Sequence, residues 1–262
     1  MPKHYLALHT IFIPSENIQW LEEFLVYYIH NGFDHFYLYD NEGSIGRNSS
    51  TPTKNKYGFP IQKSSDHTNK LVTILQTYGD YITYRQWQPK NAAGDIIYGQ
   101  HESIADCMKH YGADNEWIAF MDLDEFIYSP AQIHIPDYLK SQEDTVSCVR
   151  LTQKKFIDRF LSAEKFVTQE FHCIPSHRVD VRWGRKNIVR CKDFLSSTEI
   201  HHGFILQGDI KDAPPAILRF NHYNVNDALL TWMKGFFNLD TTPPVDEIDS
   251  GMRRYKYLFD KS

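Results

Sequence analysis

The ten residues from 117 to 126 (WIAFMDLDEF) constrain this chain most, because an apolar run ends there in three acidic side chains. The apolar part is short and rich in aromatic residues, a composition typical of a buried strand. Asp122 and Asp124 follow it two positions apart, with Glu125 beside them. In open α/β sheets, ligands bind at the carboxyl ends of the strands. Three neighbouring carboxylates repel one another there unless a positive charge neutralises them, and a divalent cation is the obvious candidate.

The first 130 residues alternate predicted strands and helices regularly. Strands are expected at residues 5–13, 35–39 and 81–85, before the strand that leads into the acids. Helices are expected from the N-cap Ser15 to Gly32, from the N-cap Asp66 to Gly79, and over residues 98–111. Strand-helix-strand units imply a parallel sheet. The pattern therefore predicts an α/β, Rossmann-like fold with a mainly parallel central sheet and helices on both faces.

The rhythm breaks beyond residue 130. A strand is expected at residues 145–151, then short strands and polar loops, and a helix at residues 226–238. Residues 42–65 are polar and predict a long surface loop or a flap. We predict one domain over residues 1–262, in which residues 131–262 form a C-terminal lobe on the sheet built by residues 1–130.

Charge and cysteine content exclude some classes of protein. The net charge of −5 gives no general basic footprint for nucleic acid, although the stretch 178–192 is locally basic. The four cysteines form no CxxC pair, so neither a zinc site nor a disulfide framework is expected. The start of the sequence lacks a signal-peptide core, and no apolar run reaches transmembrane length. We therefore expect a cytoplasmic protein, provided that the chain is complete.

The acidic stretch has two interpretations. Alternate residues of a strand share a face, so Asp122 and Asp124 could approach one cation, with Leu123 in the core, if the backbone stays extended. The alternative is that acids at a strand end are merely solvated or cap the next turn, but the position at the end of a fourth parallel strand favours metal binding. Glu125 is a further ligand, a contact to sugar hydroxyls, or a turn residue.

The sequence resembles glycosyltransferase family 92 in a series of blocks that follow the family's order. The blocks are residues 20–41 (WLEEFLVYYIHNGFDHFYLYDN), 98–107 (YGQHESIADC), 117–126, 185–190 (RKNIVR) with the pair His201 and His202, and 221–223 (NHY). The resemblance implies a GT-A fold, a nucleotide-sugar donor and a divalent metal, usually Mn²⁺ with Mg²⁺ as the alternative. The chain departs from the family pattern at residues 15–17 and 224–227.

The resemblance also implies roles for individual residues. Asp122 and Asp124, with His202, would hold the metal that bridges the donor phosphates, and Glu125 would be catalytic. The donor side would comprise Asp40, Asn41, Gln100, Lys186, Arg190 and His222. Lys186 or Arg190 would share the charge of the leaving group. Asp40 would accept the N3–H of a uracil ring, although Asx residues after a strand are also ordinary turn residues.

The sequence thus predicts metal-dependent transfer of a hexose or pentose, with inversion, from a UDP-linked donor such as UDP-galactose to a glycan acceptor. Inversion needs a base, and the sequence does not single one out. The base candidates are Glu170, Asp180, Asp193, Glu199 and Asp209, and Trp183 and Trp232 are candidates for stacking on the acceptor. The alternatives are a non-catalytic sugar- or nucleotide-binding module and a phosphotransferase. The latter is disfavoured because phosphatases with such an acid pair place it after their first strand.

Overall fold

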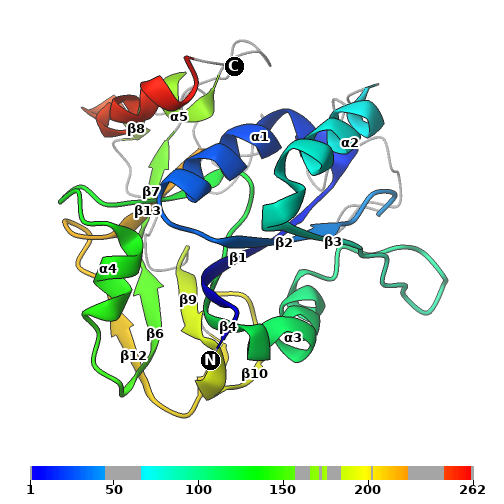
Figure 1. Cartoon of the computed structure of the whole chain (residues 1–262). Helices are drawn as coiled ribbons and strands as arrows, with labels where there is room; N and C mark the ends of the chain where they lie inside the picture. Colours follow the sequence, from blue (N-terminus) through cyan, green and yellow to red (C-terminus); the bar gives the residue numbers. More distant parts are fainter. Residues whose placement is uncertain are drawn as a thin grey trace.

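A seven-stranded sheet lies at the centre of the computed structural model, which describes residues 2–44, 66–156, 166–170, 173–175, 184–201, 203–223 and 245–260 (Figure 1). The strand order is β12-β6-β9-β4-β1-β2-β3. The strands are β1 (His4–Phe12), β2 (His35–Asp40), β3 (Ile82–Gln86), β4 (Asn115–Phe120), β6 (Val146–Leu151), β9 (Lys186–Arg190) and β12 (Asp209–Asp212). Within this sheet only β9 runs antiparallel to its neighbours. The prediction of an α/β protein with a mostly parallel central sheet is confirmed.

Helices cover both faces of the sheet, as predicted (Figure 1). Helices α1 (Pro14–His30) and α2 (His67–Tyr78) lie on one face, and α3 (Gln100–Tyr111) lies on the other. Leu71 and Ile74 of α2 join the larger core, whereas Ile104 and Cys107 of α3 join a second core on the opposite face. The helical spacing of apolar residues therefore identified the buried side of each helix.

The two ends of α1 show where local signals succeeded and failed. Gly32 follows the helix with φ +88°, a conformation that side chains disfavour, so it ends α1 as expected. The predicted cap at Ser15 is wrong, because the helix begins at Pro14 after Ile13. Proline suits the first helical position because its missing N–H has no helical partner there. The Ser15 hydroxyl instead donates to Glu42 at 2.8 Å.

The second half of the chain contributes β6, β9 and β12 to the central sheet and builds smaller layers beside it. Strands β5 (Glu125–Tyr128), β13 (Arg219–Tyr223) and β7 (Gln153–Phe156) form a three-stranded sheet in the order β5-β13-β7. The pairs β10 (Phe194–Ser197) with β11 (Phe204–Leu206) and β14 (Val245–Ile248) with β8 (Cys173–Pro175) are antiparallel. The remaining elements are the helices α4 (Ile135–Lys140) and α5 (Val167–Glu170) and 3-10 turns at Gly79–Tyr81, Gly112–Asp114, Cys191–Asp193 and Gly251–Leu258.

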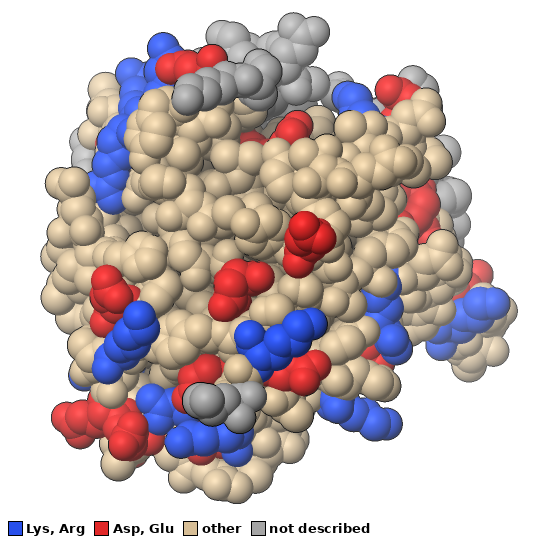
Figure 2. All heavy atoms as spheres, viewed as in Figure 1, with Lys and Arg blue, Asp and Glu red and all other residues tan. Residues whose placement is uncertain are grey.

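Two sequence predictions fall on other parts of the chain. The helix expected at residues 226–238 and most of the loop expected at residues 42–65 lie outside the described residues. In the described ranges, no helix combines the length and the apolar character needed to cross a bilayer. On the face shown in Figure 2, acidic and basic side chains stand close together around broad uncharged areas.

Glu23 joins α1 to α5 from a buried position. Its side chain is 2% exposed, and its carboxylate accepts hydrogen bonds from the backbone of Val167 and from the backbone and hydroxyl of Thr168, at 2.6–2.9 Å. Burial raises the pKa of Glu23 to about 7, although the bonds from Thr168 and Val167 act to lower it. Because this pKa exceeds its ordinary value of 4.5, folding is favoured when Glu23 is protonated.

We therefore expect a pH-dependent stability difference between the wild type and Glu23→Gln. The contribution of Glu23 is fully present below about pH 4.5 and is lost as the pH rises through about 7, a loss of about 3 kcal/mol. Chemical denaturation from pH 4.5 to 8 measures it as the difference between the two proteins. Glu22→Gln, at the exposed neighbouring position, controls for loss of a carboxylate from α1. A difference that stays constant with pH would contradict the expectation.

Candidate active site

The acidic stretch turns rather than remaining extended. Strand β4 ends at Phe120, and the N–H of Glu125 donates to the carbonyl of Asp122 at 3.0 Å, which closes a turn before β5. Leu123 is 5% exposed and packs in the larger core, as expected. Because the backbone turns, Asp122 and Asp124 do not alternate along one strand, and the contacts of their two carboxylates differ.

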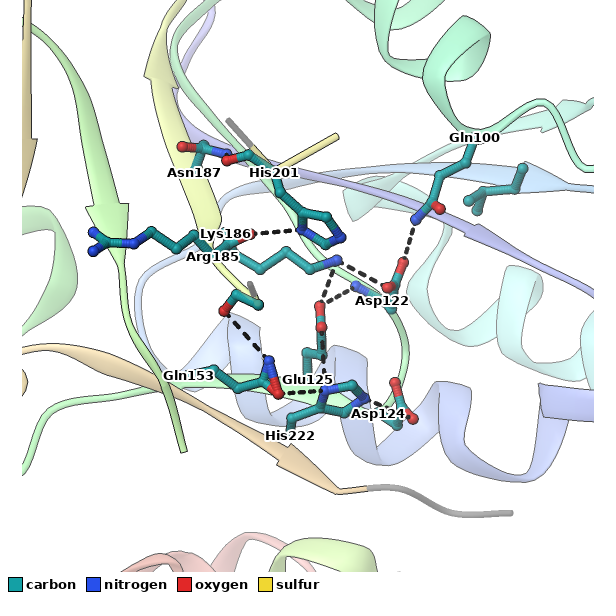
Figure 3. Close-up of polar contacts among 12 residues, drawn as sticks. Gln100, Asp122, Asp124, Glu125, Gln153, Arg185, Lys186, Asn187, His201 and His222 are labelled. Atoms are coloured by element: carbon teal, nitrogen blue, oxygen red, sulfur yellow. Dashed lines mark hydrogen bonds and ion pairs between the residues drawn. The ribbon is translucent and has the colours of Figure 1, made fainter. Parts of the chain in front are cut away.

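Lys186 lies between Asp122 and Glu125 (Figure 3). Because β9 is antiparallel to β4 and Asn187 is paired with Phe120, Lys186 begins β9 at the carboxyl end of β4. Its Nζ is 2.8 Å from Oδ2 of Asp122 and 2.7 Å from Oε2 of Glu125, and the residue is only 4% exposed. The positive charge that the acidic stretch requires is thus supplied, at least in part, by the chain itself.

Gln100 and the backbone complete this arrangement. Gln100 is the first residue of α3, and its Nε2 donates to Oδ1 of Asp122 at 2.8 Å. The residue before it, Gly99, has φ +56°, and a Cβ there would lie 2.7 Å from Pro89, so glycine suits this turn. The N–H of Asp122 donates to Oε2 of Glu125 at 2.9 Å. We call Gln100, Asp122, Glu125 and Lys186 the ionic cluster.

Burial and mutual attraction set the charges of the ionic cluster. Burial raises the pKa of Glu125 to about 7, because the lowering effect of Lys186 does not fully compensate and Asp122 adds repulsion. Burial acts to raise the pKa of Asp122 too, but Lys186 outweighs it and holds that pKa below its ordinary value. Burial acts to lower the pKa of Lys186, whereas Asp122 and Glu125 together raise it above its usual range. Asp122 and Lys186 are therefore an ion pair at neutral pH, and Glu125 takes up a proton more readily than an ordinary carboxylate.

Strand β13 brings His222 to the same place. His222 is paired with Glu125 across the small sheet. Its Nε2 is 3.4 Å from Oδ2 of Asp124, and its Nδ1 is 3.7 Å from Oε1 of Glu125. The carbonyl of Asp124 also accepts from the N–H of Tyr223 at 2.8 Å, which fixes the backbone beside this contact. The structure therefore brings His222, Gln100 and Lys186 to the predicted acids.

Asp40 ends β2 at the carboxyl edge of the sheet, as expected for parallel strands, and Asn41 follows it. The carboxylate of Asp40 accepts from the hydroxyl of Tyr84 and from the N–H of Glu42. Burial raises the pKa of Asp40, and the bond from Tyr84 acts against that change. The Asn41 amide donates to the carbonyls of Trp87 and Ile97 in the following loop. The turn interpretation is thus visible in the structure, and a role in donor binding stays a prediction.

The structure does not bring Arg190 to the ionic cluster. Arg190 ends β9, opposite Trp117 at the start of β4, four residues and about 13 Å from Lys186. Its guanidinium lies 4.6 Å from the ring centre of Trp117 and donates to the carbonyl of Asp144 at 2.7 Å. Its described contacts are those of a packed structural residue.

The remaining predicted residues are only partly covered. His202, Asp180, Trp183, Trp232 and the side chain of Glu170 lie outside the described residues. Asp193 accepts from the Ser147 hydroxyl at 2.8 Å, and Asp209 is exposed on β12. His201 contacts the carbonyl of Arg185 through Nδ1 at 2.9 Å. Burial lowers the pKa of His201, and the positive charge of Lys186 lowers it further. These contacts do not identify the base.

Three residues at the site were not found from the sequence. His9 of β1 lines a small cavity with Gln100, Asp122 and Lys186, and burial lowers the pKa of His9 to about 3. Gln153 and Lys155 lie on β7, where burial lowers the pKa of Lys155 although Glu125 opposes that change. Gln153 contacts His222 directly. In the sequence, Gln153 and Lys155 are marked only by their spacing of two residues on a short strand. That spacing does not show that β7 pairs with β13 and so does not place the two residues at the site.

Comparisons with known proteins give one family match. A family model described as Glycosyltransferase family 92 matches residues 55–250, well over half of the chain. The matched range contains all four residues of the ionic cluster, together with Asp124 and His222. A search of curated proteins finds no match.

Proposed function

Because the chain belongs to glycosyltransferase family 92, we propose that it transfers a sugar from a nucleotide-sugar donor to a glycan acceptor in a metal-dependent reaction. The proposed donor is UDP-linked, for example UDP-galactose, and the proposed transfer inverts the anomeric centre. The proposed fold is GT-A, with residues 131–262 forming the acceptor side. The family and the arrangement of charged side chains at the end of β4 support these statements.

The position of the ionic cluster carries the proposal. Asp122, Glu125 and Lys186 lie together beyond the carboxyl end of β4, at the edge where open α/β sheets bind their ligands. Asp40 ends β2 at the same edge of the sheet, and β1 lies between β2 and β4. In this proposal the donor extends from its nucleoside side at Asp40 to its phosphates near Asp124. A diphosphate fits there only if cations balance its charge.

The residues around Asp124 fit a divalent cation. The Asp124 side chain is 23% exposed and therefore accessible, and its Oδ2 faces Nε2 of His222. Hard cations of this size commonly take one or two carboxylates and complete their shell with water and substrate phosphates. Imidazole is a suitable ligand for Mn²⁺. Across the described ranges, no cluster of three or more His, Cys, Asp or Glu is arranged to hold a metal, so donor phosphates would supply further ligands in this proposal.

Each group has a separate task in the proposed reaction. When bound, the cation stabilises the negative charge that develops on the departing nucleoside diphosphate. Lys186 holds Asp122 and Glu125 together and places a positive charge beside that position. Gln100 restrains the second oxygen of Asp122. These contacts keep the acidic turn in one conformation, so that little reorganisation is needed when the donor binds.

A donor panel tests the proposed function. The purified chain is incubated with Mn²⁺ and a set of nucleotide sugars, and release of the nucleoside diphosphate is measured with and without glycan acceptors. We expect one donor to be consumed and EDTA to stop the reaction. The absence of both binding and turnover for every donor would contradict the proposal. Donor binding by calorimetry without turnover on a broad acceptor array would instead identify a non-catalytic binding module.

A further inference from the structure

Gln153 links β7 to His222 from a buried position. It is 7% exposed, and its side-chain amide has two contacts in Figure 3. Nε2 donates to the carbonyl of Gly184 at 3.3 Å, and Oε1 is 3.2 Å from Nδ1 of His222. The proposed function does not yet give this residue a task.

The Gly184 carbonyl determines which way the amide of Gln153 faces. A carbonyl oxygen only accepts hydrogen bonds, so the NH₂ group must point toward Gly184. The amide oxygen then faces Nδ1 of His222, and because that oxygen also only accepts, Nδ1 must carry a hydrogen. Glu125 presents a second acceptor oxygen to the same nitrogen, at 3.7 Å. Both neighbours therefore favour the Nδ1–H form of the ring.

The other ring nitrogen is then available as a ligand. In a neutral imidazole with Nδ1–H, Nε2 carries a lone pair. Nε2 lies 3.4 Å from Oδ2 of Asp124, longer than the 2.7–2.9 Å typical of a charge-assisted hydrogen bond. Two adjacent ligands of an octahedral cation, with bonds of about 2.1 Å, lie about 3 Å apart. The spacing suits two ligands that share a cation after a small adjustment.

We propose that Gln153 is a positioning residue that holds His222 in its Nδ1–H form, so that Nε2 joins the Asp124 carboxylate as the protein's ligands for the divalent cation. This inference rests on the proposed metal dependence and deepens it, because it gives Gln153 a task at that site. The pairing of β7 with β13 sets Gln153 diagonally against His222.

Gly184 helps to hold the Gln153 side chain in place. A Cβ at Gly184 would lie 1.6 Å from Nε2 of Gln153, which is far inside van der Waals contact. The end of the Gln153 side chain would have to move, and its contact with His222 would be lost. Gly184→Ala therefore removes the positioning contact without changing either Gln153 or His222.

Mn²⁺ binding in the absence of donor tests the inference. Free Mn²⁺ is titrated by electron paramagnetic resonance at fixed pH, and thermal unfolding is recorded for each variant. Partners that orient a metal-bound histidine typically contribute about 10- to 100-fold in affinity, so Gln153→Met and Gly184→Ala should each weaken binding about 10-fold or more. Gln153→Glu keeps an acceptor oxygen toward Nδ1 and should stay within about 3-fold of wild type, even though its added negative charge beside Glu125 lowers stability. Gln142→Met is the matched control and should bind Mn²⁺ as tightly as wild type. Gln142 is also buried, and in the described contacts its amide donates to the nearby Tyr138 carbonyl and Ser141 hydroxyl.

The pairing of variants separates positioning from a general structural effect. His222→Ala should weaken Mn²⁺ binding at least as much as Gln153→Met, and adding Gln153→Met to His222→Ala should cause no further loss. Wild-type affinity in Gln153→Met or in His222→Ala would overturn the inference, as would a wild-type chain that binds no Mn²⁺. If Mn²⁺ binds with the expected ranking but no donor is turned over, the inference stands and the proposed transferase activity fails.

Discussion

Replacing Lys186 with methionine is expected to lower the free energy of unfolding by about 3 to 5 kcal/mol. The ammonium lies 2.7–2.8 Å from the carboxylates of both Asp122 and Glu125, and it is almost fully buried. Methionine keeps most of the volume but leaves the buried Glu125 and the half-buried Asp122 without their cation. Their repulsion is relieved only by taking up a proton, so the loss should be smaller at acidic pH and grow as the pH rises.

Urea denaturation of matched variants measures this effect. Lys186→Met/Glu125→Gln should recover part of the lost stability, because it removes one of the two uncompensated carboxylates. Lys140→Met is the control, since Lys140 is an exposed partner of Asp137 and surface pairs contribute little. A Lys186→Met variant as stable as wild type at pH 8 would show that the ionic cluster does not need this cation.

Asp124→Asn is expected to reduce kcat/KM for sugar transfer by about 10²- to 10³-fold while leaving the fold intact. Asp124 is partly exposed, its carboxylate lies 3.4 Å from Nε2 of His222, and it interacts electrostatically with Lys155. Its loss therefore removes a ligand of the proposed cation and little packing. Asp122 differs, because it is bound by both Gln100 and Lys186, so Asp122→Asn should lower stability as well as activity.

Steady-state kinetics and thermal unfolding, measured together, separate the two aspartates. Asp80→Asn, at an exposed position in the 3-10 turn Gly79–Tyr81, controls for the loss of a carboxylate and should change neither quantity. Full transfer activity in Asp124→Asn would remove Asp124 from the proposed metal site. Parallel loss of activity and folding would show that Asp124 acts through structure, as Asp122 is expected to do.

Local sequence patterns predicted the elements of the first half because their signals lie within a few residues. Gly32 ended α1 through a conformation that suits glycine, and the spacing of Leu71 and Ile74 identified the buried side of α2. Ser15 misled because proline one position earlier starts the helix equally well. The strand that leads into the acids was found, but the sequence left open whether the acids stay extended or turn, since an acidic turn and an extended acidic pair look alike in sequence.

The site required contacts that local patterns do not contain. Lys186 reaches Asp122 only because β9 enters the sheet antiparallel, and the same direction carries Arg190 to the opposite edge. Both residues had equal standing in the sequence. Gln153 and His222 meet through the pairing of β7 with β13, two short strands far apart along the chain. Residue types therefore indicated the chemistry, whereas strand direction and register decided which residues take part.

The position of β9 between β4 and β6 also has a consequence for the order of assembly. Residues 1–130 contain Asp122 and Glu125, but their cation arrives on a strand that follows β6 and inserts beside β4. During synthesis, the acids emerge well before Lys186 and remain uncompensated until β9 is in place. A fragment that ends near residue 130 would expose the apolar edge of β4 and keep unpaired acids at its end. We therefore expect the two halves to fold as one cooperative unit, with the site completed last.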